Sequence, residues 1–369
     1  MSMKNRPLFY LGHPAHYHLF KGAINDLIQK RVTVSVVIKK KDVLENLVKA
    51  EGWEYITLVG NPKSHQLIVR FYNIFRLLYL WLIVFFRGRT LLIGSAAELA
   101  LIGRTLKRES LVFFEDDLNE VPLFAKLAGP NASMLICPIS CSAGKWESRS
   151  FKYPSYHELA YLHPNNFTPD ITRLPSAIDT KRPFYILRFS DLQAYHDVGK
   201  SGITDEVAIQ LIAILESHGQ VFITSERKLS ASLERYRISI SPELIHHALY
   251  FADLFIGDSQ TMTAECAVLG TMSFRYNGFV GRLGYLEELE HKYDLTKGVL
   301  ANDPHDLISL VSQYLEAPYS NEEMTMRRKR MLSEMVDLNE LLKWLIEKYP
   351  DSRNSWKMDN TPFLDFIKT

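Results

Sequence analysis

Short apolar runs alternate with longer amphipathic segments along most of the chain. The runs are rich in Val, Ile, Leu and Phe without strict polar alternation, so they predict strands that are buried on both faces. Segments with apolar residues at helical spacing separate them. The first half predicts strands at 7–11, 32–38, 55–58, 91–94, 111–114 and 133–136. The second half predicts strands at 184–187, 221–224, 238–240, 254–257 and 272–275, and one long helix over 321–348.

The alternation breaks once, between Cys137 and Pro183. That stretch is rich in Pro, Ser, Tyr and Asn and has no sustained period, which is typical of a linker or a functional loop. A chain of 369 residues also exceeds one typical core. We therefore expect an α/β protein with two doubly wound, Rossmann-like domains facing a cleft. The predicted parts are an N-terminal domain at 1–178 with a linker region at 137–178, a C-terminal domain at 179–340, and a helix end and tail at 341–369.

The stretch 251–270, FADLFIGDSQTMTAECAVLG, predicts a buried strand, a polar turn and a helix. The amides at such a helix start favour a phosphate or diphosphate. Glu265 lies one turn further in, where it is placed to accept hydrogen bonds from a sugar diol. The alternative is an ordinary βα unit with an N-cap and with Glu265 on a solvated face. The candidate anion-binding residues are Asp258, Ser259, Gln260, Thr261 and Met262.

Two other strand ends of the second domain carry candidate substrate contacts. Arg188 and Ser190 follow the strand at 184–187, and the guanidinium fork of an arginine suits the oxygens of a diphosphate. Ser225 follows the strand at 221–224. The alternatives are an interdomain salt bridge for Arg188 and a simple turn with a helix cap for Ser225.

In the first domain, histidines and an acid follow predicted strands. The loop after the first strand holds His13, His16 and His18, and His16 is the favoured general base, with His13 as a substrate contact. Glu115 opens an acidic triplet after the strand at 111–114, and a crowded acid can act as a base with a raised pKa. Helix capping and packing remain the alternatives for both groups.

Composition and the absence of several sequence motifs argue against several classes of function. The net charge of +1 gives no global attraction to nucleic acid. The three cysteines form no CxxC pair, which indicates neither a zinc site nor a disulfide framework and suits a reducing cytoplasm. The chain also lacks GxGxxG, Walker, GxSxG and HExxH motifs and begins without signal-peptide architecture. We predict a cytoplasmic protein with no metal, no cofactor and no nucleic-acid partner.

The segment 68–89 is strongly apolar but interrupted and flanked by arginines. Its uninterrupted apolar run, Leu77 to Phe86, is about half a spanning length, so we do not expect a transmembrane helix. One interpretation is a helix that lies on an anionic membrane surface, which would make the protein peripheral on the inner face of the cell membrane. The other is a packing helix buried within an α/β domain.

Four segments carry a resemblance to known proteins: GHPAHYHLFKGAINDL, FFEDD, YLHPNNFTPD and ADLFIGDSQTMTAECAVLG. Over most of its length, to about residue 300, the chain resembles an uncharacterised bacterial and archaeal family of glycosyltransferase-B type. More distantly it is similar to UDP-N-acetylglucosamine 2-epimerases and to the transferase that adds N-acetylglucosamine to the lipid-linked peptidoglycan precursor. The resemblance implies a two-domain fold with a nucleotide sugar in the C-terminal half.

The resemblance also implies roles for individual residues. Ser259 and Glu265 keep the epimerase spacing between the diphosphate turn and the glutamate that holds the ribose, with Gln260 and Thr261 in place of two glycines. Glu115 matches a catalytic glutamate of the epimerases, whereas Ser95 stands where they have an aspartate. Their histidine at the start of the second domain has no counterpart, since Leu187 and Arg188 stand there. His16 matches a loop histidine of the peptidoglycan transferase.

These observations together favour a metal-independent glycosyltransferase. We expect it to transfer a sugar from a nucleotide-diphosphate donor to a glycan or lipid-linked acceptor in envelope polysaccharide synthesis. An epimerase-like sugar-nucleotide enzyme is the first alternative. A non-catalytic sugar-nucleotide-binding protein is the second.

Overall fold

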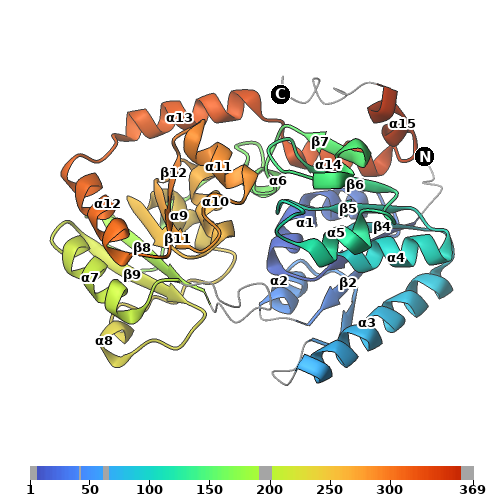
Figure 1. The fold of residues 1–369 in the computed structure, drawn as a ribbon, viewed down its shortest axis with the longest axis horizontal. Coiled ribbons are helices and arrows are strands. Elements are labelled where there is room, and N and C mark those ends of the chain that lie inside the picture. Colours follow the sequence, from blue (N-terminus) through green and yellow to red (C-terminus); the bar gives the residue numbers. More distant parts are fainter. Residues whose placement is uncertain (1–5, 41–42, 61–65, 191–201, 359–369) are drawn as a thin grey trace. The chain divides into compact units, whose positions relative to one another are not determined.

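The structure, a computed structural model, describes residues 6–40, 43–60, 66–190 and 202–358. It divides into two compact units, which Figure 1 colours along the sequence. Unit 1 contains Met1–Tyr161 and Val336–Thr369, and unit 2 contains Leu162–Met335. The sequence predicted changes of domain at 178/179 and at 340/341, and the compact units change over earlier at both places. The last residues of the predicted tail, 359–369, lie outside the described residues.

Unit 1 is built on a seven-stranded parallel sheet with the order β3-β2-β1-β4-β5-β6-β7. Its central strands are buried along nearly their whole length, as the continuous apolar runs predicted. The strands are β1 (Arg6–Leu11), β2 (Ser35–Lys39), β3 (Tyr55–Leu58), β4 (Thr90–Gly94), β5 (Ser110–Phe113), β6 (Met134–Pro138) and β7 (Ser150–Tyr153).

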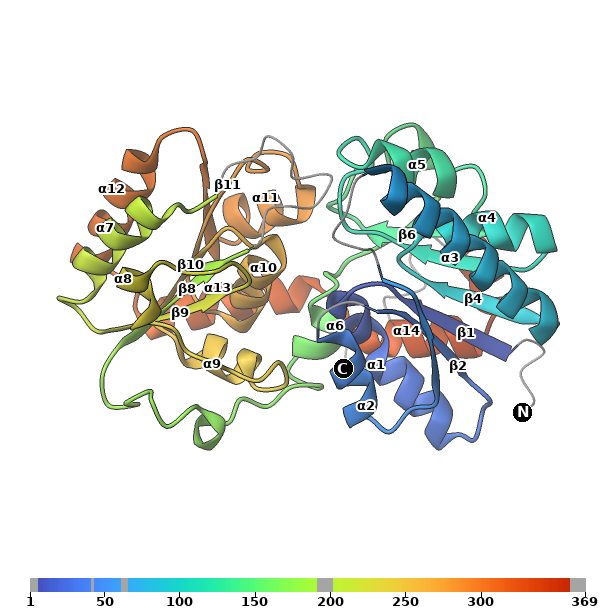
Figure 2. The same cartoon turned by 90° about the horizontal axis from the view of Figure 1, so that it is seen from below.

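Helices cover both faces of this sheet, as Figure 2 shows. On one face α1, α2 and α14 pack into a core that the last helix, α15, also joins. On the other face α3 packs beside α4, and α4 beside α5. The helices are α1 (Pro14–Gln29), α2 (Leu44–Ala50), α3 (Gln66–Arg87), α4 (Ala97–Leu106), α5 (Pro122–Ala128), the 3-10 helix η1 (Gly144–Arg149), α6 (Leu159–Leu162, at the border of the units), α14 (Leu338–Glu347) and α15 (Asp351–Met358).

Unit 2 is built on a five-stranded parallel sheet with the order β12-β11-β10-β8-β9. Its strands are β8 (Phe184–Phe189), β9 (Gln220–Ser225), β10 (Leu254–Gly257), β11 (Ser273–Asn277) and β12 (Thr296–Leu300). α7 packs beside α12, and α10 beside α9 and α11 (Figure 1). The helices are η2 (Ile171–Arg173), α7 (Asp205–Leu215), α8 (Ala231–Glu234), α9 (Ile245–Phe251), α10 (Gln260–Leu269), α11 (Gly284–His291), α12 (Pro304–Glu316) and α13 (Asn321–Glu334).

Each sheet has one place where the strand order reverses. In unit 1 the chain runs outward from β1 through β2 to β3, then returns to the other side of β1 with β4. In unit 2 it runs from β8 to β9, then returns to the other side of β8 with β10. At such a reversal the two following loops leave in opposite directions, which opens a crevice for ligands beyond the carboxyl ends of the strands.

The prediction of two doubly wound α/β units is confirmed, but several element predictions are wrong. The long helix over 321–348 is two helices, because Asp337 caps α14 by accepting the N–H groups of Asn339 and Glu340. The segment 238–240 is not a strand, and the only pairing beside it among the described residues is an isolated bridge between Ile223 and Arg237. The missed elements include β12, α15 and, within the predicted linker region, β7 and the short helices η1, α6 and η2.

Candidate functional site

The strand, turn and helix predicted over 251–270 are β10, a two-residue turn and α10. Ser259 is the N-cap of α10, and its hydroxyl accepts a hydrogen bond from the N–H of Met262 at 3.3 Å. Helical geometry leaves the N–H groups of Gln260 and Thr261 without an acceptor inside the helix. The first turn of α10 carries no acid that would compete for them. This helix start therefore has the backbone donors and the dipole that bind an anion.

Asp258 ties this turn to the neighbouring strand. Its Oδ1 accepts the N–H of Ser190 at 2.7 Å, and its backbone oxygen accepts a hydrogen bond from Asn277 at 3.0 Å. The side chain is almost fully buried, and burial raises the pKa of this carboxyl. Two of the residues predicted to contact the anion, Asp258 and Ser190, are thus hydrogen-bonded to each other. Their bond holds together the ends of β8 and β10, where the strand order reverses.

Arg188 lies beside the same turn. It is paired with Gly257 across β8 and β10, and a Cβ on Gly257 would come within 3.0 Å of the Cβ of Arg188. The Arg188 guanidinium forms an ion pair with Glu226, which lies in the same unit. This ion pair is therefore not the interdomain salt bridge that the sequence offered as the alternative role of Arg188. Its buried Nε has no hydrogen-bond partner among the described residues. A buried guanidinium N–H without a partner is a donor that an anion at this edge would satisfy.

Ser225 lies at the end of β9, and its side chain forms hydrogen bonds within the turn that follows. Its hydroxyl donates to the backbone oxygen of Arg227 at 2.8 Å and accepts the N–H of the same residue at 3.2 Å. These contacts are those of the turn that the sequence offered as the alternative role for Ser225.

Glu265 is buried in α10 and is hydrogen-bonded from a neighbouring helix. Its Oε1 lies 3.0 Å from Nε2 of His246 in α9, and both side chains are less than a tenth exposed. The alternative of a solvated face is therefore wrong: residues Thr263–Leu269 of α10 are all buried. A buried, hydrogen-bonded carboxylate is a fixed acceptor, which is what recognition of a sugar diol requires.

In unit 1, the predicted histidine loop opens α1 at the strand reversal. His13 is the N-cap of α1, and its side chain accepts the N–H of Ala15 at 3.2 Å. His16 Nδ1 accepts the N–H of Gly12, also at 3.2 Å. In the neutral ring the proton then sits on Nε2, so that nitrogen donates rather than accepts. For His16 to take a proton from a substrate through Nε2, the ring must first give up its bond to Gly12.

Glu115 follows β5 and pairs with a residue that the sequence did not single out, His157. The Glu115 Oε1 accepts the backbone N–H of His157 at 2.8 Å, and Oε2 lies 3.4 Å from Nδ1 of its ring. Burial raises the pKa of Glu115 to about 8, although the backbone hydrogen bond from His157 opposes it. Burial, with the nearby His16, lowers the pKa of His157 to about 3. At neutral pH the pair is therefore mostly uncharged.

Buried polar atoms without partners surround this pair. Within the described residues, the Tyr153 hydroxyl and Nε2 of His157 have none. The Cys141 thiol donates to the backbone oxygen of Glu115 at 2.8 Å, which fixes the loop that carries the acid. His157 follows β7 in the chain, so the same rule of strand ends would have identified it if β7 had been recognised. Orphaned buried atoms beside an acid with a raised pKa are typical of a substrate site.

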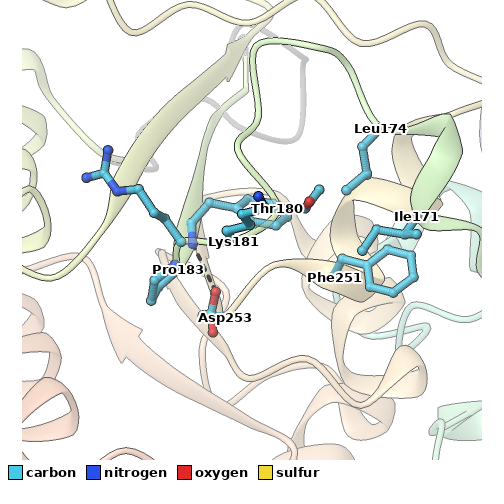
Figure 3. Close-up of a pocket in the computed structure, with 9 residues that line it drawn as sticks. Ile171, Leu174, Thr180, Lys181, Pro183, Phe251 and Asp253 are labelled. Atoms are coloured by element: carbon cyan, nitrogen blue, oxygen red, sulfur yellow. Dashed lines mark hydrogen bonds between the residues drawn. The ribbon is translucent and has the colours of Figure 1, made fainter.

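Figure 3 shows a pocket that lies elsewhere in unit 2. It encloses about 230 Å³ at the start of β8, where Asp253 Oδ2 accepts the N–H of Phe184 at 2.9 Å. The amino ends of β8 and β10 border it, so it faces the edge opposite to the one where ligands of doubly wound sheets bind. We therefore do not assign the expected nucleotide sugar to it. Its lining residues are Ile171, Leu174, Thr180, Lys181, Arg182, Pro183, Phe184, Phe251 and Asp253.

Comparison with solved structures identifies the architecture. A Listeria monocytogenes protein assigned as a UDP-N-acetylglucosamine 2-epimerase superposes with a TM-score of 0.69 at 12% identity, covering 95% of this chain and 98% of its own. The calicheamicin glycosyltransferase CalG4 superposes with a TM-score of 0.60 at 10% identity, covering 94% and 100%. The chain has the glycosyltransferase-B fold. The predicted likeness to glycosyltransferases of this type and to the epimerases is thus confirmed at the level of fold.

A further structure with this fold contains ligands. It is Anabaena HepE in complex with UDP and glucose, with a TM-score of 0.60 at 12% identity over 93% of this chain and 99% of its own. No protein-family profile matches the chain. No curated protein matches its sequence either.

The Glu115–His157 pair predicts a pH dependence of stability. A carboxyl with a raised pKa keeps its proton in the folded state after the unfolded chain has lost it, so stability falls as pH rises from its ordinary pKa of 4.5 to about 8. His157, with an ordinary pKa of 6.5, opposes this only below about pH 6.5. Between about pH 6.5 and pH 8 we expect the free energy of unfolding of unit 1 to fall by about 1–2 kcal/mol.

The measurement is urea unfolding followed by tryptophan fluorescence. All five tryptophans lie in unit 1, so the signal reports that unit alone: Trp53, Trp81, Trp146, Trp344 and Trp356. The Glu115→Gln variant, which stays neutral at every pH, should lose this pH dependence. Identical pH profiles for the variant and the wild type would show that Glu115 is an ordinary, ionised carboxylate.

Proposed function

We propose that the protein is a metal-independent glycosyltransferase that uses a nucleotide-diphosphate sugar. The observation that carries the proposal is the start of α10, where backbone amides and the partnerless Nε of Arg188 meet at the strand reversal of unit 2. Departure of the nucleotide leaves negative charge on its diphosphate. Donors already held in place stabilise that charge without reorganisation, which lowers the barrier to transfer.

The rest of the donor has candidate contacts in the same unit. Glu265 sits one turn beyond the helix start and is held by His246, so its carboxylate is fixed for the ribose hydroxyls. Three structures with this fold are described as complexes with UDP-N-acetylglucosamine, with UDP and glucose, and with thymidine diphosphate. Their ligands support a nucleoside diphosphate as the class of ligand for unit 2.

Unit 1 supplies the proton transfer in this proposal. An acceptor hydroxyl must lose a proton as it attacks the sugar, and a neutral, buried imidazole can take it. The His157 ring has its Nδ1 toward Glu115 and a buried Nε2 without a partner in the described part of the chain. Once Glu115 loses its proton, which its pKa of about 8 makes increasingly common as pH rises toward 8, its carboxylate would hold the proton on Nδ1 and leave Nε2 as the base. We assign this role to His157 with Glu115, and the role of an acceptor contact to His16 and His13.

We further propose a glycan or lipid-linked acceptor, as in the assembly of an envelope polysaccharide, and a location at the cytoplasmic side of the membrane. The support is the resemblance to the transferase of the lipid-linked peptidoglycan precursor and the apolar surface of α3.

A second candidate is a sugar-nucleotide 2-epimerase or a related enzyme that hydrolyses the sugar–nucleotide bond. The buried Glu115 favours it, because a carboxyl with a pKa of about 8 can exchange protons with carbon near neutral pH. Ser95 counts against it, since a hydroxyl at the end of β4 cannot replace an aspartate as an acid or base.

Nucleotide binding tests the donor site. Gln260 is the first residue of α10, where proline is tolerated, so Gln260→Pro deletes one amide donor and leaves the helix intact. A hydrogen bond to a charged group is worth about 1.5–3 kcal/mol, so affinity should fall by about tenfold or more. The measurement is calorimetric titration with UDP, thymidine diphosphate, GDP and ADP.

The matched control is Asn321→Pro at the first position of α13, whose N-cap is also a serine. It should leave nucleotide affinity unchanged. Arg188→Ala should weaken binding, whereas Arg237→Ala, which breaks an ion pair with Glu234 in the same unit, should not. Absence of binding by the wild type to every nucleotide would overturn the proposal, and so would a Gln260→Pro variant with unchanged affinity.

Isotope incorporation separates the two candidate reactions. The wild type is incubated in deuterated water with the nucleotide sugar that binds best, with and without a crude membrane-lipid acceptor. A transferase releases nucleotide only with the acceptor and leaves C2 of the sugar unlabelled, and Glu115→Gln slows that release. Deuterium at C2 without an acceptor would identify an epimerase instead.

A further inference from the structure

Helix α3 of unit 1 exposes large apolar side chains in one continuous row. Nine of them are between 42% and 81% exposed. They recur every three or four residues, so they share one face of the helix. The row consists of Ile68, Phe71, Ile74, Phe75, Leu78, Tyr79, Leu82, Phe85 and Phe86. Soluble proteins rarely leave so many adjacent apolar side chains in water, so this face has an occupant.

The opposite face of α3 is packed against unit 1. Leu80 and Val84 are buried, and so is Arg76, which donates to the Asn73 side chain at 2.7 Å and to the backbone oxygen of Val59 at 3.5 Å. The helix runs along the lower edge of unit 1 in Figure 1 and lies in front of the sheet in Figure 2, which is seen from below. The prediction of a fully sandwiched packing helix is therefore wrong: one face is buried and the other is open.

The charges around the row are all of one sign. No Asp or Glu occurs between Glu54 and Glu98, whereas Arg70, Arg87 and Arg89 are exposed at or beside the ends of the helix. Arginines that flank an exposed aromatic and aliphatic row match the pattern of helices that lie in a membrane interface, with cations at the headgroups and apolar side chains below.

We propose that this face of α3 docks on an anionic lipid surface, with the helix axis in the plane of the membrane. By length and composition α3 could also cross a membrane. Crossing would remove Leu80 and Val84 from the core and carry Arg76 into hydrocarbon, both of which are costly. A second copy of the chain is the weaker occupant, because a symmetric pair would bring two acid-free, arginine-bearing helices together. The inference deepens the proposed location at the membrane, and it holds whichever sugar-nucleotide reaction the chain performs.

Vesicle co-sedimentation of the full-length protein tests the inference. The vesicles contain either phosphatidylcholine alone or equal amounts of phosphatidylcholine and phosphatidylglycerol. The wild type should sediment with the anionic vesicles and release at high salt, because the arginines contribute a screened attraction. Leu78→Glu with Phe85→Glu should lower the partition coefficient at least tenfold. Arg70→Gln with Arg89→Gln should remove the preference for anionic lipid.

The control introduces the same charge at other exposed apolar residues of unit 1, Leu123 and Ile28. Leu123→Glu with Ile28→Glu should sediment like the wild type. The inference fails if the wild type stays in the supernatant with both vesicles, or if the Leu78 and Phe85 variant sediments as well as the control. It also fails if light scattering shows a wild-type dimer that these substitutions dissociate while vesicle binding is absent.

A labelled variant keeps the test valid if the double substitution unfolds the chain. The three native cysteines are buried, so a Leu78→Cys variant offers one accessible thiol for an environment-sensitive fluorophore. Its emission should shift to the blue when anionic vesicles are added, and the emission of the same label on Leu123→Cys should not. Equal emission with and without vesicles at both positions would contradict docking through α3.

Discussion

The hydrogen bond between the Asp258 carboxylate and the Ser190 amide holds together the part of unit 2 on which its chemistry depends. It joins the ends of β8 and β10 at the strand reversal and places the start of α10 beside Arg188. Gly257 permits the approach, since any Cβ there would press on Arg188. A buried carboxyl is costly unless hydrogen bonds satisfy it, and here the backbone N–H of Ser190 donates to it. Anion-binding amides and the arginine are thus positioned before any ligand arrives.

In unit 1 the electrostatics of the candidate site depend on the Glu115–His157 pair. Glu115 and His157 are both largely buried, with 13% and 16% of their side chains exposed, and the loss of solvation drives their pKa values in opposite directions, to about 8 and about 3. Neither group is then forced to carry a charge in a poorly solvated place. A neutral acid beside a neutral imidazole can exchange a proton with modest cost when a substrate arrives. This is the property that a proton-transfer site needs near neutral pH.

Much of the fold follows from the continuity of the apolar strands, and the errors have physical causes. β7 was missed because its four residues, SFKY, alternate polar and aromatic side chains and three of them are only half-buried at a sheet edge, so no apolar run marks them. The break between α13 and α14 was missed because helical periodicity continues across Asp337, whose capping role only the hydrogen bonds reveal. Ser259, Arg188 and Glu115 could be found from strand ends. His157 was missed because β7, the strand before it, was not recognised. The pairing of His246 with Glu265 joins two different helices, so no local pattern marks it.

The central claim is that the amide end of α10 binds a nucleoside diphosphate. Hydrogen exchange of the full-length protein, measured by mass spectrometry with and without saturating UDP, tests it at the atoms concerned. The account predicts slower exchange in the peptide covering Gly257–Thr263, where the N–H groups of Gln260 and Thr261 have no acceptor within the helix. Protection around Thr180–Phe184 at the opposite edge of the sheet, or no protection anywhere in unit 2, would contradict it.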